Sequence, residues 1–147
     1  MEPYNLDRDI KLVCFRAASF PDGVMAAHQK LHSLLPNTWK RNICGISWPD
    51  GKGSLVYMAG AEESQPGETE QLGGEAFIVK KGYYLSILIH DYMSDLPAFG
   101  KAFTELCSDP RIDPHGIAVE MYLSEKEVRC MVQLDPAKVL NPVPSFN

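Results

Sequence analysis

The stretch Gly116–Asp135, GIAVEMYLSEKEVRCMVQLD, decides the fold that the rest of the chain has to complete. It predicts two strands joined by the polar turn Ser124–Glu127. Side chains on a strand point alternately to the two faces of a sheet. The first strand therefore has one wholly apolar face and one face that carries a carboxylate and a phenol. The apolar face holds Ile117, Val119, Met121 and Leu123, and the other holds Ala118, Glu120 and Tyr122.

Glu120 is the unusual residue of this strand, because carboxylates are depleted in mid-strand positions. One interpretation is a salt bridge with Arg129 or Arg16 on a neighbouring strand. The other is a cleft, in which a poorly solvated carboxylate beside aromatic rings would attract a cation or act as an acid or base. The sequence pattern leaves both interpretations open.

Length and charge limit the class of protein. A chain of 147 residues supports one hydrophobic core, so a single domain over residues 1–147 is expected. The net charge of −5 and the short basic pairs Lys40-Arg41 and Lys80-Lys81 argue against direct nucleic-acid binding. The longest strongly apolar run, Tyr83–Ile89, is too short to span a membrane, and no signal peptide is visible. A cytoplasmic protein without membrane contact is expected.

No metal or cofactor is expected from the cysteines and histidines. The four cysteines are isolated and show no metal-ligand spacing, which predicts reduced cysteines, most of them inside apolar segments. His28 and His32 lie one helical turn apart, a spacing that can bind metal, but no carboxylate accompanies them in a zinc motif. Two solvated helix histidines are the favoured interpretation.

The remaining elements follow from local patterns. Met1–Asp9 is expected to be a loosely held lead-in, and Glu62–Gly74 an exposed acidic linker because it is rich in Gly, Pro and Glu. A helix is predicted from about Pro21 to Leu35, and a second after Ser94 with the stripe Leu96, Phe99, Phe103 and Leu106. The tail after Asp135, with Pro136, Pro142 and Pro144, is expected to be extended or disordered. Strands are predicted at Ile10–Phe20, Asn42–Trp48, Ser54–Ala61, Glu75–Lys80 and Tyr83–Tyr92.

The order strand, helix, strand, turn, strand occurs once before the acidic linker and once after it. Two such pseudo-repeats, at about 10–61 and 75–135, predict an α+β fold with one antiparallel sheet. Both helices would lie on one face and cover the apolar face of the 117–123 strand. Glu120 and Tyr122 would then lie on the opposite face, in a cleft at the seam between the halves.

With this order of elements, the chain resembles the GyrI-like domains, also called bacterial transcription-activator effector-binding domains. The resemblance rests on Gly45-Ile46, the run Tyr57–Glu62, Gly82-Tyr83-Tyr84 and Glu120-Met121-Tyr122, and spans about residues 10–135. It implies a duplicated strand-helix-strand-strand (SHS2) fold and an aromatic cleft, with an acidic floor, that holds lipophilic and often cationic molecules. Many relatives carry a DNA-binding domain before this one, for which this chain has no room. The residues placed in the cleft by the resemblance are Glu120, Tyr122, Tyr57, Trp39, Trp48, Tyr83 and Tyr84.

Three functions follow as hypotheses. The first is a stand-alone small-molecule binding domain, acting as an effector sensor or drug-binding protein. The second is an enzyme, a hydrolase of reactive electrophiles with Glu120 and Tyr122 as its catalytic pair. The third is a regulatory protein that docks on a larger protein partner through the acidic segment 62–74. The sequence does not set the oligomeric state.

Overall fold

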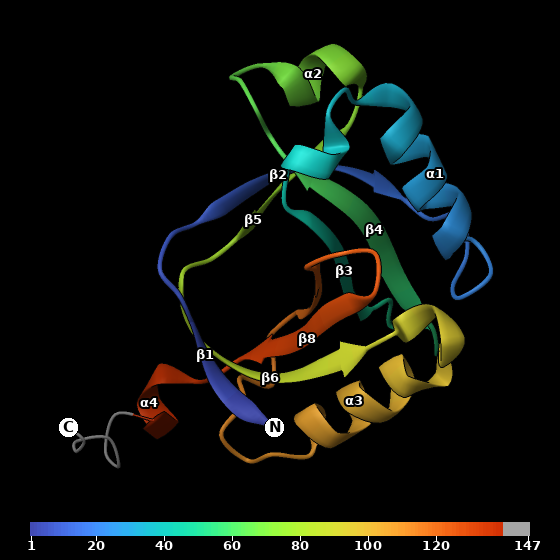
Figure 1. Cartoon of the computed structure of the whole chain (residues 1–147). Helices are drawn as coiled ribbons and strands as arrows, with labels where there is room; N and C mark the ends of the chain where they lie inside the picture. The colour runs from blue at the N-terminus through green and yellow to red at the C-terminus, as the bar shows by residue number, and fades with distance from the viewer. Residues whose placement is uncertain (140–147) are drawn as a thin grey trace.

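The computed structural model describes residues 1–139, which form an α+β fold around one eight-stranded antiparallel sheet that curls on itself (Figure 1). The strand order in the sheet is β1-β6-β8-β7-β3-β4-β2-β5, so β3 and β7 meet in the middle. The strands are β1 (Glu2–Leu6), β2 (Ile10–Arg16), β3 (Ile43–Pro49), β4 (Leu55–Glu62), β5 (Glu75–Val79), β6 (Gly82–His90), β7 (Ala118–Tyr122) and β8 (Glu127–Gln133).

Four α-helices and two short 3-10 helices occur within residues 1–139, and none of them is long and apolar enough to cross a membrane. They are α1 (Val24–Leu34), η1 (Thr38–Lys40), α2 (Glu68–Leu72), η2 (Tyr92–Ser94), α3 (Pro97–Cys107) and α4 (Pro136–Val139). The first long helix thus begins at Val24, not at Pro21. Pro97 opens α3 as predicted, because a proline in the first turn needs no hydrogen-bond partner for its nitrogen.

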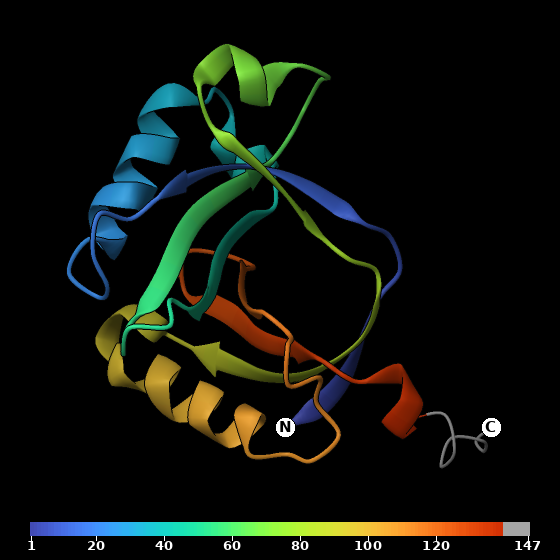
Figure 2. The same ribbon diagram turned by 180° about the vertical axis from the view of Figure 1, so that it is seen from behind.

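The main core lies inside the curl of the sheet. Val119 and Met121 of β7 belong to this core. Figure 2 shows strands of the same sheet on opposite sides of the interior. We expected the helices to cover the face of β7 that carries these two residues, and that prediction is wrong: the curl lets strands on opposite sides of the sheet bury each other's apolar residues. The core consists of Leu6, Ile10, Leu12, Cys14, Cys44, Ile46, Met58, Val79, Tyr84, Val119, Met121 and Met131.

The two long helices pack on the outer face of the sheet, each over a different half. α1 buries Ala27 and Leu31 against Val13, Ala59 and neighbours on β2 and β4. α3 buries Ala102 and Leu106 against a second set of residues on β6 and β8. Figure 1 shows α1 and α3 on the same side of the sheet, with the central strands between them. The helices therefore cover the outer face over β2 and β4 and over β6 and β8, and β3 and β7 lie between the two covered regions.

Two terminal segments differ from expectation. Met1–Asp9 is not a loose lead-in, because β1 pairs with β6 along the edge of the sheet. Pro136 is not in an extended tail, because it opens the short helix α4, which suits a residue with a fixed φ. Pro142 and Pro144 lie outside the described residues.

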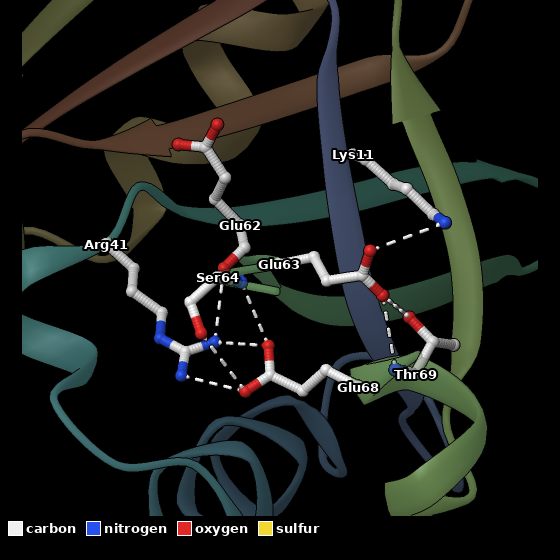
Figure 3. Close-up of polar contacts among 7 residues, drawn as sticks. All are labelled: Lys11, Arg41, Glu62, Glu63, Ser64, Glu68 and Thr69. Atoms are coloured by element: carbon white, nitrogen blue, oxygen red, sulfur yellow. Dashed lines mark hydrogen bonds and ion pairs between the residues drawn. The ribbon is translucent and has the colours of Figure 1, made fainter. Parts of the chain in front are cut away.

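The acidic segment 62–74 is largely exposed, as expected, but it contains the short helix α2 and is held to the sheet by a buried ion pair. Glu68, at the start of α2, forms an ion pair with Arg41 in which the side chains are 6% and 7% exposed. Figure 3 shows the two guanidinium nitrogens facing the two carboxylate oxygens, at 2.7 and 2.9 Å. Glu63 accepts hydrogen bonds from the backbone nitrogen and hydroxyl of Thr69. The acidic composition therefore reflects internal pairing, which weakens the idea that this segment is a flexible docking loop.

Candidate functional site

Glu120 lies on the outer face of the sheet, at the gap between the two helices. In an antiparallel sheet, residues directly opposite each other share a face. Glu120 is opposite Gly45 on β3 and Cys130 on β8, and Cys130 packs under α3. We had expected the cleft on the face opposite the helices, and this is wrong. The alternation of side chains along β7 was predicted correctly. The helices pack on the Glu120 face because the other face of β7 is already buried against strands of the same curled sheet.

A chain of hydrogen bonds ends on one oxygen of Glu120. The hydroxyls of Tyr57 and Tyr122 both donate to Oε1, at 2.7 and 2.8 Å. The His28 Nε2 atom lies 2.8 Å from the Tyr57 hydroxyl. The single Tyr57 proton is already used, so His28 must carry its proton on Nε2 and donate it. Three elements, α1, β4 and β7, thus hold one carboxylate in a fixed position.

The network forms part of the wall of a cleft of about 1040 Å³ on the outer face. This volume suits a small molecule. The rings of Tyr122, His28 and Tyr92 pack edge to face, with centroids 5.4 Å apart in each contact. Other lining side chains come from the β2–α1 connection, α1, η1, β3, η2, the start of α3 and the β7–β8 turn. They include Phe20, Val24, Met25, Trp39, Ile43, Met93, Leu96, Phe99 and Leu123.

Burial controls the proton affinities in the network. It raises the pKa of the Glu120 carboxyl, and the hydrogen bonds from Tyr57 and Tyr122 lower that pKa part of the way back. Burial, followed by the charge of Glu120, raises the pKa of both phenols well above the usual range. The phenols therefore stay protonated and donate, and the arrangement is suited to an ionised Glu120 as the acceptor.

The charges that line the cleft are mainly negative. Asp22 and Glu125 lie at its edge, in addition to Glu120. Arg41 also lines it, but its guanidinium is engaged by Glu68. Burial, and then the nearby His32, lower the pKa of His28 to about 4, so His28 is neutral at pH 7. Within the described residues, no lysine or arginine lies within 4.0 Å of the Glu120 carboxylate as an ion-pair partner.

The lowered pKa of His28 predicts acid-sensitive folding. The unfolded chain takes up a proton near pH 6.5 and the folded chain only near pH 4. Stability contributed by neutral His28 is therefore present above pH 6.5 and is lost as the pH falls toward 4. The loss should reach about 3 kcal/mol at most. Urea unfolding at several pH values should show a flatter profile for His28→Gln. His32→Gln is the control. His32 is exposed, so this variant should keep most of the wild-type dependence of unfolding free energy on pH.

Gly45 leaves room for the network. It lies on β3 beside both partners, and a Cβ atom built there would collide with the Tyr57 hydroxyl and with Oε1 of Glu120. The carboxylate and the phenol meet in the space that a side chain at position 45 would occupy. The glycine of the Gly45-Ile46 pair is therefore required by the site.

Gly45→Ala is expected to break the Tyr57–Glu120 hydrogen bond and to destabilise the fold by about 2 kcal/mol, since overpacking a buried site costs about 1–3 kcal/mol. Thermal unfolding gives the size of the loss. The matched control is Gly100→Ala on α3, where a Cβ atom meets nothing within 4 Å. That change should stabilise the protein, because glycine in a helix interior costs about 0.5–1 kcal/mol relative to alanine. Equal stability of the two variants would contradict the role given to Gly45.

The structure brings four of the seven candidate site residues to this cleft: Glu120, Tyr122, Tyr57 and Trp39. Trp39 lies at the rim and is 77% exposed. Trp48 does not line this cleft; it is partly buried, stacks on Phe77 at 6.3 Å and lines the neighbouring hollow. Tyr84 is buried in the main core and donates to the Lys80 carbonyl oxygen, and Tyr83 is 60% exposed on β6. A role in ligand binding stays a prediction for each of the seven.

The salt-bridge interpretation of Glu120 is wrong. Arg129 is opposite Met121, so it points to the other face, where its guanidinium lies over the ring of Tyr4 and donates to Ser86. Arg16 pairs with Glu75. Both arginines thus have other partners, and Glu120 is hydrogen-bonded by Tyr57 and Tyr122 instead.

Sequence reasoning missed His28 as a site residue. We had predicted two solvated histidines, which holds for the exposed His32, bonded to Thr38, but not for the half-buried His28. Their spacing showed only that both lie on one side of α1, not what faces that side. Phe20 and Tyr92 were missed as well. They were placed at the ends of the predicted strands Ile10–Phe20 and Tyr83–Tyr92, but β2 ends at Arg16 and β6 at His90, so both residues lie in the segments that follow these strands. No group of three or more His, Cys, Asp or Glu side chains within residues 1–139 could hold a metal ion.

Comparison with known proteins gives matches in structure only. No protein-family model and no curated protein matches the chain. An integron cassette protein from the mobile metagenome of Vibrio cholerae has a similar structure, with a TM-score of 0.67, 13% identity, and coverage of 91% of this chain and 95% of that one. The structure of SAV2435 bound to tetraphenylphosphonium matches with a TM-score of 0.56, 9% identity, and coverage of 90% and 93%. At these identities the likeness concerns the fold.

Proposed function

We propose that this chain is a binding domain for a small lipophilic cation, held in the cleft above Glu120. The observation that carries the proposal is a carboxylate with no cationic partner in the described chain, fixed by two phenols at an aromatic wall. A cation in this position gains attraction from the carboxylate and from the ring faces of Tyr122 and Tyr92. The protein loses little in return, because the hydrogen bonds that fix Glu120 exist before the ligand arrives.

The rim of the cleft supports a lipophilic ligand. Nine large apolar side chains of the described chain are exposed, and five of them gather at this one opening. Exposed apolar patches of this kind mark binding sites on otherwise polar surfaces. The five come from α1, η1, η2, the N-cap of α3 and the turn after β7, so residues from five separate segments meet at the opening. They are Met25, Trp39, Met93, Leu96 and Leu123.

The structural neighbours are consistent with this proposal. SAV2435 was solved with tetraphenylphosphonium, a lipophilic cation, and the two chains share a fold over most of their lengths. We further propose that the chain is a GyrI-like domain, built from strand-helix-strand-strand units at about 10–61 and 75–135. In support, β2-α1-β3-β4 and β6-α3-β7-β8 repeat one order of elements, and the sheet order β6-β8-β7-β3-β4-β2 is symmetric about its centre.

Two ions of nearly the same shape and opposite charge test the proposal. Tetraphenylphosphonium should bind at least about 100-fold more tightly than tetraphenylborate, because the attraction of one unit charge by a poorly solvated carboxylate is worth roughly 3 kcal/mol and the same carboxylate repels the anion. Calorimetric titration of each ion into the wild-type protein measures the ratio. Quenching of Trp39 fluorescence at the rim, absent in Trp39→Phe, would place the ligand in the cleft. Equal or tighter binding of the anion would refute a cation site.

A further inference from the structure

A second hollow of about 760 Å³ lies beside the main cleft, between α3 and the outer face of the sheet. α3 lines it with Phe99, Phe103 and Cys107, which are spaced four residues apart and so share one side of the helix. The sheet lines it with Ala118 and Val132, which are opposite each other on β7 and β8. The hollow is therefore mostly apolar, and we call it the α3 chamber.

The α3 chamber and the main cleft meet at Glu120. Four residues line both hollows: Phe20, Phe99, Gly100 and Glu120. Gly100 lies within α3 and has no side chain, and a Cβ atom there would meet nothing within 4 Å. α3 therefore has no side chain that would block the point where the two hollows join, and the Glu120 carboxylate lies at this junction.

The polar groups of the α3 chamber do not supply a second cation site. Asp109 is held by Arg111 through two side-chain hydrogen bonds. Asp113 accepts from the backbone nitrogen of His115, and Lys138 adds a positive charge at the same end. The charge that faces a cation is therefore Glu120 at the junction, and the chamber beyond it favours apolar groups.

We propose that the ligand is an elongated amphiphilic cation that occupies both hollows at once. Its charged head lies beside Glu120 in the main cleft, and its apolar chain passes Gly100 into the α3 chamber. This inference rests on the proposed cation site and extends it to a class of substrate. A head group alone would leave the α3 chamber empty, whereas a chain adds buried apolar area there.

Alkyl triphenylphosphonium ions with methyl and decyl chains test the proposal. In the wild-type protein, each methylene buried in the chamber should tighten binding by up to about fourfold, so the decyl ion should bind far better than the methyl ion. Ala118→Leu fills the chamber floor without touching the main cleft. Ala118→Leu should lower the ratio of decyl-ion to methyl-ion affinity at least tenfold and leave the affinity for the methyl ion unchanged. Unchanged binding of the methyl ion would also show that the variant folds.

Cys107 provides a second readout in the wild-type protein. It is exposed and lines the α3 chamber, whereas Cys14, Cys44 and Cys130 are buried. The decyl ion, but not the methyl ion, should slow alkylation of Cys107 by iodoacetamide by more than tenfold. Cys107→Ser supplies the background rate.

The outcomes separate this inference from the proposed function. An unchanged chain-length gain in a folded Ala118→Leu, or alkylation of Cys107 at the same rate with and without the decyl ion, would overturn the α3 chamber as a binding site. The cation function would then stand if the methyl ion still binds. Protection of Cys107 by the decyl ion with no binding of the methyl ion would instead support the chamber and count against the cation site.

Discussion

Arg41→Met is expected to destabilise the protein by about 3–5 kcal/mol, because it leaves the carboxylate of Glu68 buried without its partner. The pair is almost fully enclosed, and Glu68 makes further hydrogen bonds with the backbone nitrogen and hydroxyl of Ser64. The Arg41 guanidinium holds the pKa of the Glu68 carboxyl below its usual range. Urea unfolding at pH 7, followed by circular dichroism, measures the loss.

A double variant tests whether this loss of stability comes from the buried Glu68 carboxylate being left without an ion-pair partner. Arg41→Met combined with Glu68→Leu removes both charges and should recover most of the lost stability, since a buried ion pair is often replaceable by apolar side chains. Arg8→Met is the matched control, because Arg8 pairs with Glu62 on the surface, where such pairs are worth less than about 1 kcal/mol. If Arg41→Met costs no more than Arg8→Met, the buried pair does not hold segment 62–74 in place.

This ion pair also shows why the buried contact of the acidic segment was missed. Local composition described 62–74 as polar, charged and rich in turn residues, which is typical of an exposed loop. The partner of Glu68 lies 27 residues away in sequence, and nothing in the segment itself indicates that Arg41 will reach it. Charge runs are therefore ambiguous until the fold brings their partners together.

The alternation along β7 predicted correctly that Glu120 and Tyr122 share a face and that Val119 and Met121 share the other. It could not predict which face the helices would cover. Both faces had enough apolar neighbours to accept a helix, and the choice depends on the curl of the whole sheet. The same limit applies to His28, since a contact between α1 and β4 requires the relative position of two elements.

Glu120→Gln is expected to reduce the affinity for tetraphenylphosphonium about 100-fold, and the variant should bind tetraphenylphosphonium and tetraphenylborate with similar affinity. The glutamine Oε1 can still accept from both phenols, so the cleft should keep its shape while losing its charge. Glu105→Gln changes the net charge by the same amount at an exposed position of α3 that lines neither hollow, and it should bind the cation as the wild-type protein does. Calorimetric titration of the wild-type protein, Glu120→Gln and Glu105→Gln distinguishes an effect of the charge beside the ligand from an effect of the protein's net charge.

The same substitution is expected to stabilise the empty protein at pH 7, by about 1 kcal/mol, as often happens when a charge kept for function is removed. Burial raises the pKa of Glu120 above its ordinary value near 4.5, so the folded state holds the proton more tightly than the unfolded state. Stability from this group is therefore present at low pH and lost as the pH rises through the raised pKa. The advantage of Glu120→Gln should shrink as the pH falls below 4.5. A variant that is less stable and still binds the cation would make Glu120 a structural residue.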